Sequence, residues 1–117
     1  TLELCNFAAL GLDVVLPALK DALGFEIDHE TYMAIGERVW NSIRLFNIRE
    51  GGISRKDDTL PPRMFNEPLP MPPRGEHTIQ LTKQSFDTML DEYYELRKWD
   101  GNGIPTLEVL DQLRIAN

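Results

Sequence analysis

The chain is 117 residues long, 42% hydrophobic and 26% charged, with a formal net charge of −7 at pH 7. Its length and apolar share suit one folded domain with a genuine core and exclude a disordered chain. The negative charge argues against nucleic acid or an anionic membrane as a partner, because phosphates and lipid headgroups are also negative.

The first 24 residues are rich in apolar side chains and are broken by Gly11 and closed by Gly24. Because glycine adopts the left-handed conformation that ends helices, we expect two short helices in this segment. Asp13 is expected to cap the second helix, since its carboxylate can accept hydrogen bonds from the free N–H groups of the first turn.

The longest predicted helix begins at Asp28 and ends at Gly51. An acidic residue complements the positive end of the helix dipole, and glycine supplies a stop. The apolar side chains repeat at helical spacing and the polar ones lie on the other side. The apolar set is Val39, Ile43 and Phe46, flanked by Ile35 and Trp40, and the polar set is Glu37, Arg38, Asn41 and Arg44. Gly36, in the middle of the helix, is expected to permit the close approach of another element.

Residues 51–81 have a different composition, with two adjacent glycines, a charged run and six of the eight prolines. Proline fixes φ and removes a backbone donor, so we expect an extended strap here and neither a helix nor an interior strand. A free linker between domains is the alternative. Regularly spaced apolar side chains favour a strap laid across the helices; they are Leu60, Met64, Phe65, Leu69 and Met71.

Residues 82–117 predict a terminal helical pair, with Thr82 capping the first helix and Thr106 the second. Only residues 77–81 alternate as a short strand would. The fold class is therefore all-α: a compact bundle of about five or six helices with a Pro-rich extended strap and at most a trace of β. We expect residues 1–117 to form a single domain, with helices in 1–50, the strap in 51–81 and the helical pair in 82–117.

Five of the twelve basic residues lie between residues 44 and 63, where three carboxylates nearly balance them. That balance favours internal pairing over phosphate binding. Arg44 and Arg49, in the last turns of the long helix, are expected to pair with Asp57 or Asp58 and so to pin the loop. We therefore expect Arg49→Ala to lower the thermal midpoint.

No motif supplies catalysis by itself. His29 and His77 lack a second ligand at helical or hairpin spacing. We interpret the acidic pairs, Asp57 with Asp58 and Asp91 with Glu92, as solvated. The aromatic pair Tyr93 and Tyr94, and the tryptophans Trp40 and Trp99, are interpreted as core residues rather than as a cofactor platform.

Cys5 is the only cysteine, so an internal disulfide is impossible. A lone cysteine beside Leu4 and Phe7 is most often a small buried hydrophobe, and a ligand role would need three further thiolates from elsewhere. The chain starts at Thr1, without a signal segment or an apolar run near the ~18 residues that span a bilayer. We expect a fragment of a longer cytoplasmic protein.

Residues 36–70, GERVWNSIRLFNIREGGISRKDDTLPPRMFNEPLP, followed by residues 89–106, MLDEYYELRKWDGNGIPT, resemble the C-terminal part of the aldehyde ferredoxin oxidoreductase family of tungsten-pterin enzymes. The likeness runs from Cys5 through Thr106. Such enzymes oxidise aldehydes to carboxylic acids and pass electrons to ferredoxin. The resemblance implies a C-terminal domain whose partners are the missing N-terminal portion of the same chain, ferredoxin and a small aldehyde, and it allows a homodimer.

In this family a tungsten ion held by two pterins lies next to a [4Fe-4S] cluster, whose fourth cysteine ends an Asp-x-x-Gly-Leu-Cys motif. Leu4 and Cys5 match the end of that motif, whereas Glu3 stands where the family commonly has glycine. The resemblance implies that Cys5 is a cluster ligand and that Leu4 contacts one pterin through its main chain. It implies tungsten or molybdenum bis-pterin in the full-length enzyme, and neither cofactor nor activity in the isolated fragment. No catalytic residue is assigned to this chain.

Two other interpretations stay open. One is a non-catalytic helical protein-interaction module, in which the Pro-rich strap or the acidic helix at residues 87–98 binds another protein and Cys5 is a buried structural residue. The other is a family member that has lost its cofactor, suggested by Glu3 alone.

Overall fold

The structure, a computed structural model, describes residues 10–70 and 78–115. Within them lie five α-helices: α1 (Leu12–Leu23), α2 (His29–Gly51), α3 (Arg63–Asn66), α4 (Lys83–Leu96) and α5 (Leu107–Gln112). A 3-10 turn at Arg55–Asp57 follows α2, and two short strands, β1 (Leu69–Pro70) and β2 (Thr78–Ile79), pair antiparallel. The predicted all-α class with a trace of β is confirmed.

Helix α1 is the second of the two short helices expected near the N-terminus; the first falls on residues 1–9, outside the described part. It ends as predicted at Gly24, whose φ of 76° is left-handed and whose N–H donates to the carbonyl of Lys20. The predicted cap was wrong: the helix begins after Gly11, and Asp13 lies inside its first turn. There the carboxylate can favour the helix dipole but makes no capping hydrogen bond.

Helix α2 starts and stops where the sequence indicates. The Asp28 carboxylate accepts a hydrogen bond from the Thr31 N–H at 2.7 Å, and Gly52 closes the helix with a φ of 61°. Helix α4 is capped as predicted by Thr82, which exchanges hydrogen bonds with Ser85. Local capping chemistry therefore sets these boundaries.

The predicted strap between α2 and α4 is only partly extended, because it contains the 3-10 turn and the single helical turn of α3. Phe65 of α3 packs edge to face on Phe86 of α4, with ring centroids 5.6 Å apart. The Gln80 amide donates to the Phe65 carbonyl at 3.3 Å. These contacts tie the described end of the segment to α4, whereas the proline run at residues 71–73 lies outside the described residues.

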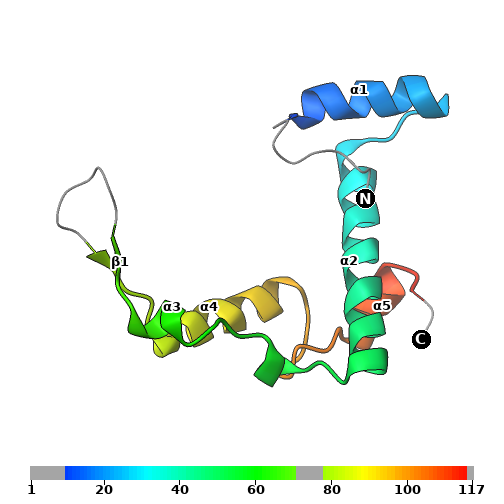
Figure 1. Cartoon of the computed structure of the whole chain (residues 1–117). Helices are drawn as coiled ribbons and strands as arrows, with labels where there is room; N and C mark the ends of the chain where they lie inside the picture. The colour runs from blue at the N-terminus through cyan, green and yellow to red at the C-terminus, as the bar shows by residue number, and fades with distance from the viewer. Residues whose placement is uncertain (1–9, 71–77, 116–117) are drawn as a thin grey trace.

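The helices are arranged as an open U (Figure 1). Helix α1 lies across one end of α2, α5 lies beside the other half of α2, and α3 and α4 form an arm that leads to β1 (Figure 1). The radius of gyration is 18.5 Å, against about 13 Å for a compact domain of this length. The bundle is therefore more open than the compact one expected from the sequence.

The core lies where α5 meets α2. Val109, Leu110 and Leu113 form a buried cluster, against which Leu45 of α2 and Ile115 pack. The α2 side that faces inward is the polar one, with Asn41 fully buried and Arg44 only 9% exposed. Its apolar side, which the sequence marks as the natural core face, stays exposed. No described helix is long and apolar enough to cross a membrane.

Candidate functional site

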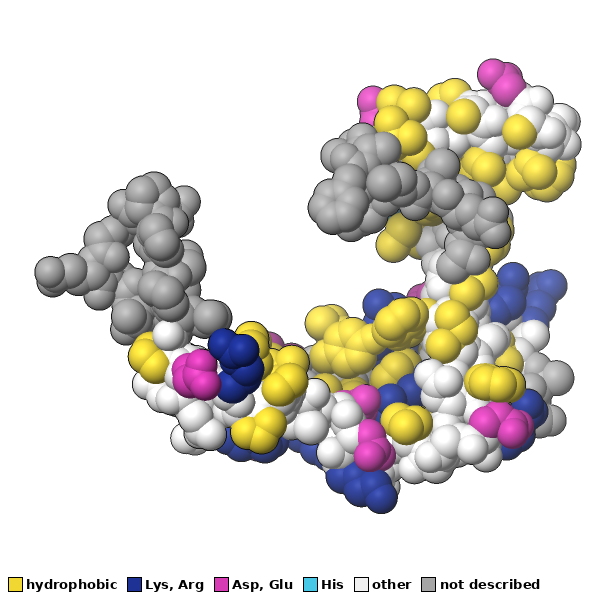
Figure 2. All heavy atoms as spheres, in the orientation of Figure 1, with side chains coloured by type: hydrophobic (Ala, Val, Ile, Leu, Met, Phe, Trp, Pro, Cys, Tyr) yellow, Lys and Arg dark blue, Asp and Glu magenta, His cyan; other side chains and the backbone are white. Residues whose placement is uncertain are grey.

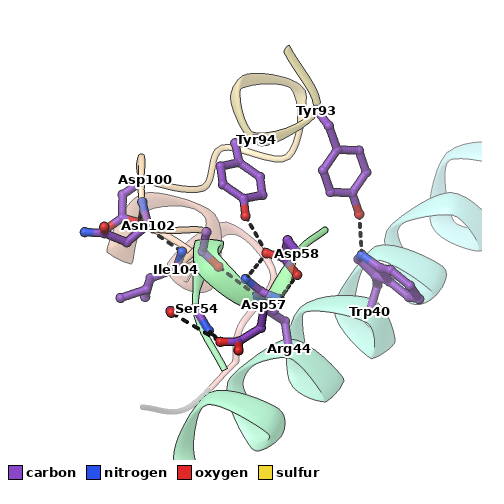
Figure 3. Close-up of polar contacts among 11 residues, drawn as sticks. Trp40, Arg44, Ser54, Asp57, Asp58, Tyr93, Tyr94, Asp100, Asn102 and Ile104 are labelled. Atoms are coloured by element: carbon purple, nitrogen blue, oxygen red, sulfur yellow. Dashed lines mark hydrogen bonds and ion pairs between the residues drawn. The ribbon is translucent and has the colours of Figure 1, made fainter. Parts of the chain in front are cut away.

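Arg44 is the centre of a buried polar cluster at the base of the U (Figure 3). Its guanidinium forks onto the Asp58 carboxylate, with Nη1 donating to Oδ1 at 2.8 Å and Nη2 to Oδ2 at 2.5 Å. Its Nε donates to the Gly103 carbonyl at 2.8 Å. The three hydrogen bonds join α2 to two loops distant in sequence, and bidentate geometry makes the ion pair specific.

Tyr94 of α4 completes the cluster, because its hydroxyl donates to Asp58 Oδ2 (Figure 3). Gly103 closes it from the other side with a φ of 76°. A Cβ at that position would lie 2.4 Å from Arg44 Nη2 and 2.6 Å from the Tyr94 hydroxyl. Glycine is therefore required here by both backbone conformation and space.

Trp99 forms the floor of the cluster. Its indole N–H donates to the buried Asn41 side chain at 2.8 Å, and the Arg44 guanidinium carbon lies 4.9 Å from the Trp99 ring centroid. The Trp99 ring also packs on Tyr94, with centroids 5.8 Å apart. The buried polar side chains of α2, Asn41 and Arg44, thus contact an aromatic ring and hydrogen-bonding groups.

Two turns position these loops. Asp100 accepts hydrogen bonds from the N–H groups of Asn102 and Ile104 at 2.8 and 2.9 Å, which closes the loop that presents Gly103. Asp57 accepts from the Ser54 N–H at 2.9 Å and so closes the turn that presents Asp58. Short polar side chains of this kind stabilise turns by bonding nearby backbone groups.

The cluster shifts the titration of its members. Burial opposes the charged form of Asp58, but the hydrogen bonds from Arg44 and Tyr94 outweigh it and lower the Asp58 pKa. Burial, with the hydrogen bond to Asp58, raises the pKa of Tyr94 to about 12. For Arg44, the hydrogen bonds and charge of Asp58 outweigh burial and raise the pKa. Arg44 and Asp58 are charged and Tyr94 is neutral at pH 7.

A hollow of about 430 Å³ opens beside the cluster, between α2 and α4. Trp40, Ile43, Phe86 and Leu90 give it apolar walls, and Asp58 lies at its polar end. The Trp40 indole donates to the Tyr93 hydroxyl at 2.8 Å across the rim (Figure 3). Asp57 and Arg44 also line the hollow, so it has apolar and aromatic walls and one charged end.

The cluster joins elements and has no group free for chemistry. Among the described residues, every buried side-chain nitrogen and oxygen has a hydrogen-bond partner, and no three His, Cys, Asp or Glu side chains gather as metal ligands. A carboxylate held by a guanidinium and a phenol is stabilised as the anion, which makes it a poor proton acceptor.

The predicted site residues fare differently. Leu4 and Cys5 lie outside the described residues, so their expected roles stay predictions. Arg44 pairs with Asp58 as expected, but Arg49 was wrongly assigned: it pairs with its neighbour Glu50, and its side chain is 73% exposed. Arg49 therefore pins no loop, and the predicted effect of Arg49→Ala loses its structural reason.

Sequence reasoning named Asp58 as one of two possible partners of Arg44 but also interpreted it as solvated, whereas its side chain is only 24% exposed. It did not predict that Tyr94 and Gly103 complete the cluster. A charged residue in a turn is usually exposed to solvent. Only the tertiary structure, which brings Arg44, Tyr94 and Gly103 together around Asp58, shows that this carboxylate is largely buried. The prediction that the aromatic residues are core is confirmed for Tyr94 and Trp99, which are buried, and is wrong for Trp40, which is 47% exposed.

The described residues form an open, mostly helical fold whose longest helix is held by a buried polar cluster. A family model described as aldehyde ferredoxin oxidoreductase, domains 2 & 3, matches residues 1–115. The chain belongs to the aldehyde ferredoxin oxidoreductase family.

Three curated relatives show how much of a longer protein the chain represents. It is 43% identical over 115 residues to a tungsten-containing aldehyde ferredoxin oxidoreductase of Pyrococcus furiosus and 41% identical over 115 residues to one of Thermococcus kodakarensis. It is 33% identical over 120 residues to an aliphatic sulfonate oxidoreductase, WOR-like subunit, of P. furiosus. Each match covers 97% of this chain but only 18% or 19% of the relative. The comparisons give no support to an interaction module.

Proposed function

We propose that this chain is the C-terminal domain of a tungsten-dependent enzyme that oxidises an aldehyde to a carboxylic acid. The observation that supports it is the 43% identity to a tungsten-containing aldehyde ferredoxin oxidoreductase over 97% of this chain. In the reaction, an aldehyde and water give an acid, two protons and two electrons, and the electrons pass to ferredoxin. The pterin-bound metal and the iron–sulfur cluster supply the redox chemistry when bound.

Within this proposal, Cys5 ligates the [4Fe-4S] cluster. Thiolate is the donor that such clusters take, and this chain has one cysteine, so three donors come from elsewhere in the full-length protein. The described residues offer no competing group of metal ligands. Leu4 contacts one pterin through its main chain, and the segment of residues 1–12 shields the cluster from water with Phe7 and Leu10.

The role of this chain in the reaction is to ligate the iron–sulfur cluster and to orient it. Cluster potential depends on solvent exposure and on hydrogen bonds to sulfur, both of which a domain covering the cluster controls. Leu10 is exposed in the described part of the chain and so can cover an external group. Arg44 and Asp58 join the C-terminal half of α2 to the neighbouring loops, and no proton transfer is assigned to them.

The test uses the full-length protein. We expect tungsten or molybdenum in the native protein, aldehyde-dependent reduction of a viologen dye, and loss of iron and of visible iron–sulfur absorbance in Cys5→Ser and Cys5→Ala. Arg49→Ala, at an exposed position, should retain wild-type iron. Unchanged iron and absorbance in the cysteine variants would remove Cys5 from the ligand set, and a native protein without either metal would overturn the enzyme assignment.

A second candidate differs in substrate. The 33% identity to a protein named aliphatic sulfonate oxidoreductase favours a sister enzyme that oxidises another small organic substrate. Assaying the full-length protein with aldehydes and with aliphatic sulfonates in parallel separates the two. Activity on sulfonates alone would replace the aldehyde assignment while leaving the role of Cys5 intact.

A further inference from the structure

Helix α2 buries polar side chains at the Arg44 cluster, whereas its large apolar side chains stay exposed along the inner side of the U. Met33 is 53%, Trp40 47% and Ile43 45% exposed, whereas Asn41 and Arg44 are buried. Large apolar side chains that line one face of a helix normally lie against a partner. A face of this kind in a structure with few buried hydrophobic residues points to a missing contact.

The exposed side is hollowed along its length. A groove of about 660 Å³ runs between α1 and α2 and is lined chiefly by Leu19, Leu23, Ile27, Met33 and Trp40. Trp40 also lines the hollow beside Asp58, and Ile43 lines both that hollow and a third one next to Phe46. The shared residues make the three hollows neighbours along one strip, and Figure 2 shows hydrophobic side chains gathered on the inner side of the U.

We propose that this strip, from Met33 to Ile43 on α2 together with the α1 groove, is where the remaining polypeptide of the full-length enzyme packs. The inference rests on the proposed function, since this chain spans only 18% of the length of its tungsten-containing relatives. The occupant is an apolar protein surface that belongs to the same polypeptide, and it fills the inside of the U.

A second copy of this chain fits the strip poorly. A twofold contact is self-complementary, and two surfaces that are both hollow cannot fill each other. Two copies would also bring together chains that each carry a formal charge of −7. The remainder of the polypeptide differs from this chain and so does not have to match a copy of the same hollow surface.

Gly36 supports a close contact at the centre of the groove. It lines the groove, and a Cβ placed on it would meet no atom within 4 Å. The sequence predicts that another element comes close to α2 at Gly36, and no described residue does so. In the full-length protein the occupant approaches α2 there, because the missing side chain lets a neighbouring backbone come near.

Hydroxyl-radical footprinting of the full-length protein tests the proposal. If the strip were free, Met33 and Trp40 would oxidise at about half the rate measured in urea-unfolded protein, in line with their 53% and 47% exposure. We expect rates far below half, because the occupant covers both side chains. Rates near half would overturn the proposal, and so would protection that appears only at concentrations where the full-length protein dimerises.

A pair of matched variants gives a second readout. Met33→Glu places a charge against the occupant and should lower the thermal midpoint of the full-length protein by roughly 5 °C or more. Thr88→Glu places the same charge at an exposed position of α4 that lines none of the three hollows, and should change it by about 1 °C at most. Equal midpoints would contradict the proposal. Neither measurement depends on metal content or turnover, so the proposed function can fail separately.

Discussion

Arg44 is the residue at which segments distant in sequence meet. Its guanidinium bonds Asp58 from one loop and Gly103 from another, and it stacks on Trp99. A buried ion pair adds little net stability, but the loss of one member leaves the other charge uncompensated. The contribution of Arg44 therefore depends on Asp58.

Replacing Asp58 with asparagine should destabilise the protein by about 3 kcal/mol, because the Arg44 guanidinium would stay buried without a counter-charge. Urea unfolding followed by circular dichroism measures the difference. Asp91→Asn is the matched control: Asp91 pairs with Arg55 at 2.6 Å but is 65% exposed, so about 0–1 kcal/mol is expected. Equal losses in the two variants would show that Arg44 finds other compensation.

The pH dependence of Tyr94 has a definite sign. An unfolded tyrosine titrates near pH 10, whereas Tyr94 keeps its proton until about pH 12 in the folded chain. The unfolded state therefore loses its proton first, and the stability that Tyr94 contributes is complete below pH 10 and is lost as pH rises toward 12. Asp58 acts on the acid side: its lowered pKa gives stability above the usual titration range of aspartate that is lost as pH falls through the lowered value.

Tyr94→Phe should consequently flatten the alkaline side of the stability curve. Between pH 10 and 12 the wild-type protein should lose on the order of 2 kcal/mol more than the variant. Unfolding free energies at half-unit pH steps measure this, with Tyr32→Phe as a control outside the cluster. Parallel alkaline limbs in wild type and Tyr94→Phe would mean that the hydroxyl does not retain its proton on folding.

At the scale of elements, caps and glycines decide where helices begin and end. Asp28, Gly51 and Thr82 were identified from the sequence because the signals are local: a capping side chain satisfies the nearest backbone groups, and the glycine pair ends α2, with Gly51 as its last residue and Gly52 in the left-handed conformation. Asp13 was misplaced by two residues, because Gly11 is the N-cap and Leu12 the first helical residue. A shift of that size is common, since several residues near an N-terminus can serve as the cap.

Asp28→Ala should destabilise α2, through loss of the hydrogen bond from Thr31 N–H. The change would be measured as a lower urea midpoint with an unchanged slope. Asp28→Asn keeps an oxygen acceptor at the cap and should recover most of the loss. If asparagine were as damaging as alanine, the charge rather than the hydrogen bond would be the main contribution.

At the scale of the whole molecule, the described chain is an open structure with exposed hydrophobic side chains. Leu23, Phe25, Met33 and Phe46 are among them. Exposed apolar surface of this extent promotes association, and the hydrophobic effect is not directional. The chain studied alone should therefore aggregate more readily than the full-length protein.

A paired substitution should show this. Met33→Glu combined with Phe46→Glu should raise the concentration at which the 117-residue chain begins to scatter light, because two charges replace exposed apolar surface. Thr31→Glu combined with Thr88→Glu adds the same two charges at exposed polar positions and should help less. Equal gains from the two proteins would indicate that net charge, and not the apolar strip, governs solubility.

By itself the sequence determined the helical class, the bounds of α2 and α4, and the family, because periodicity, caps and the run of residues 36–70 are local properties of the chain. Only the tertiary structure decided which side of α2 is buried. Periodicity marks an apolar and a polar side, but it cannot say which partner each side meets. Asp58, Tyr94 and Gly103 come together around Arg44 in the folded chain and bury the polar side of α2. The apolar side is left to contact the rest of the polypeptide.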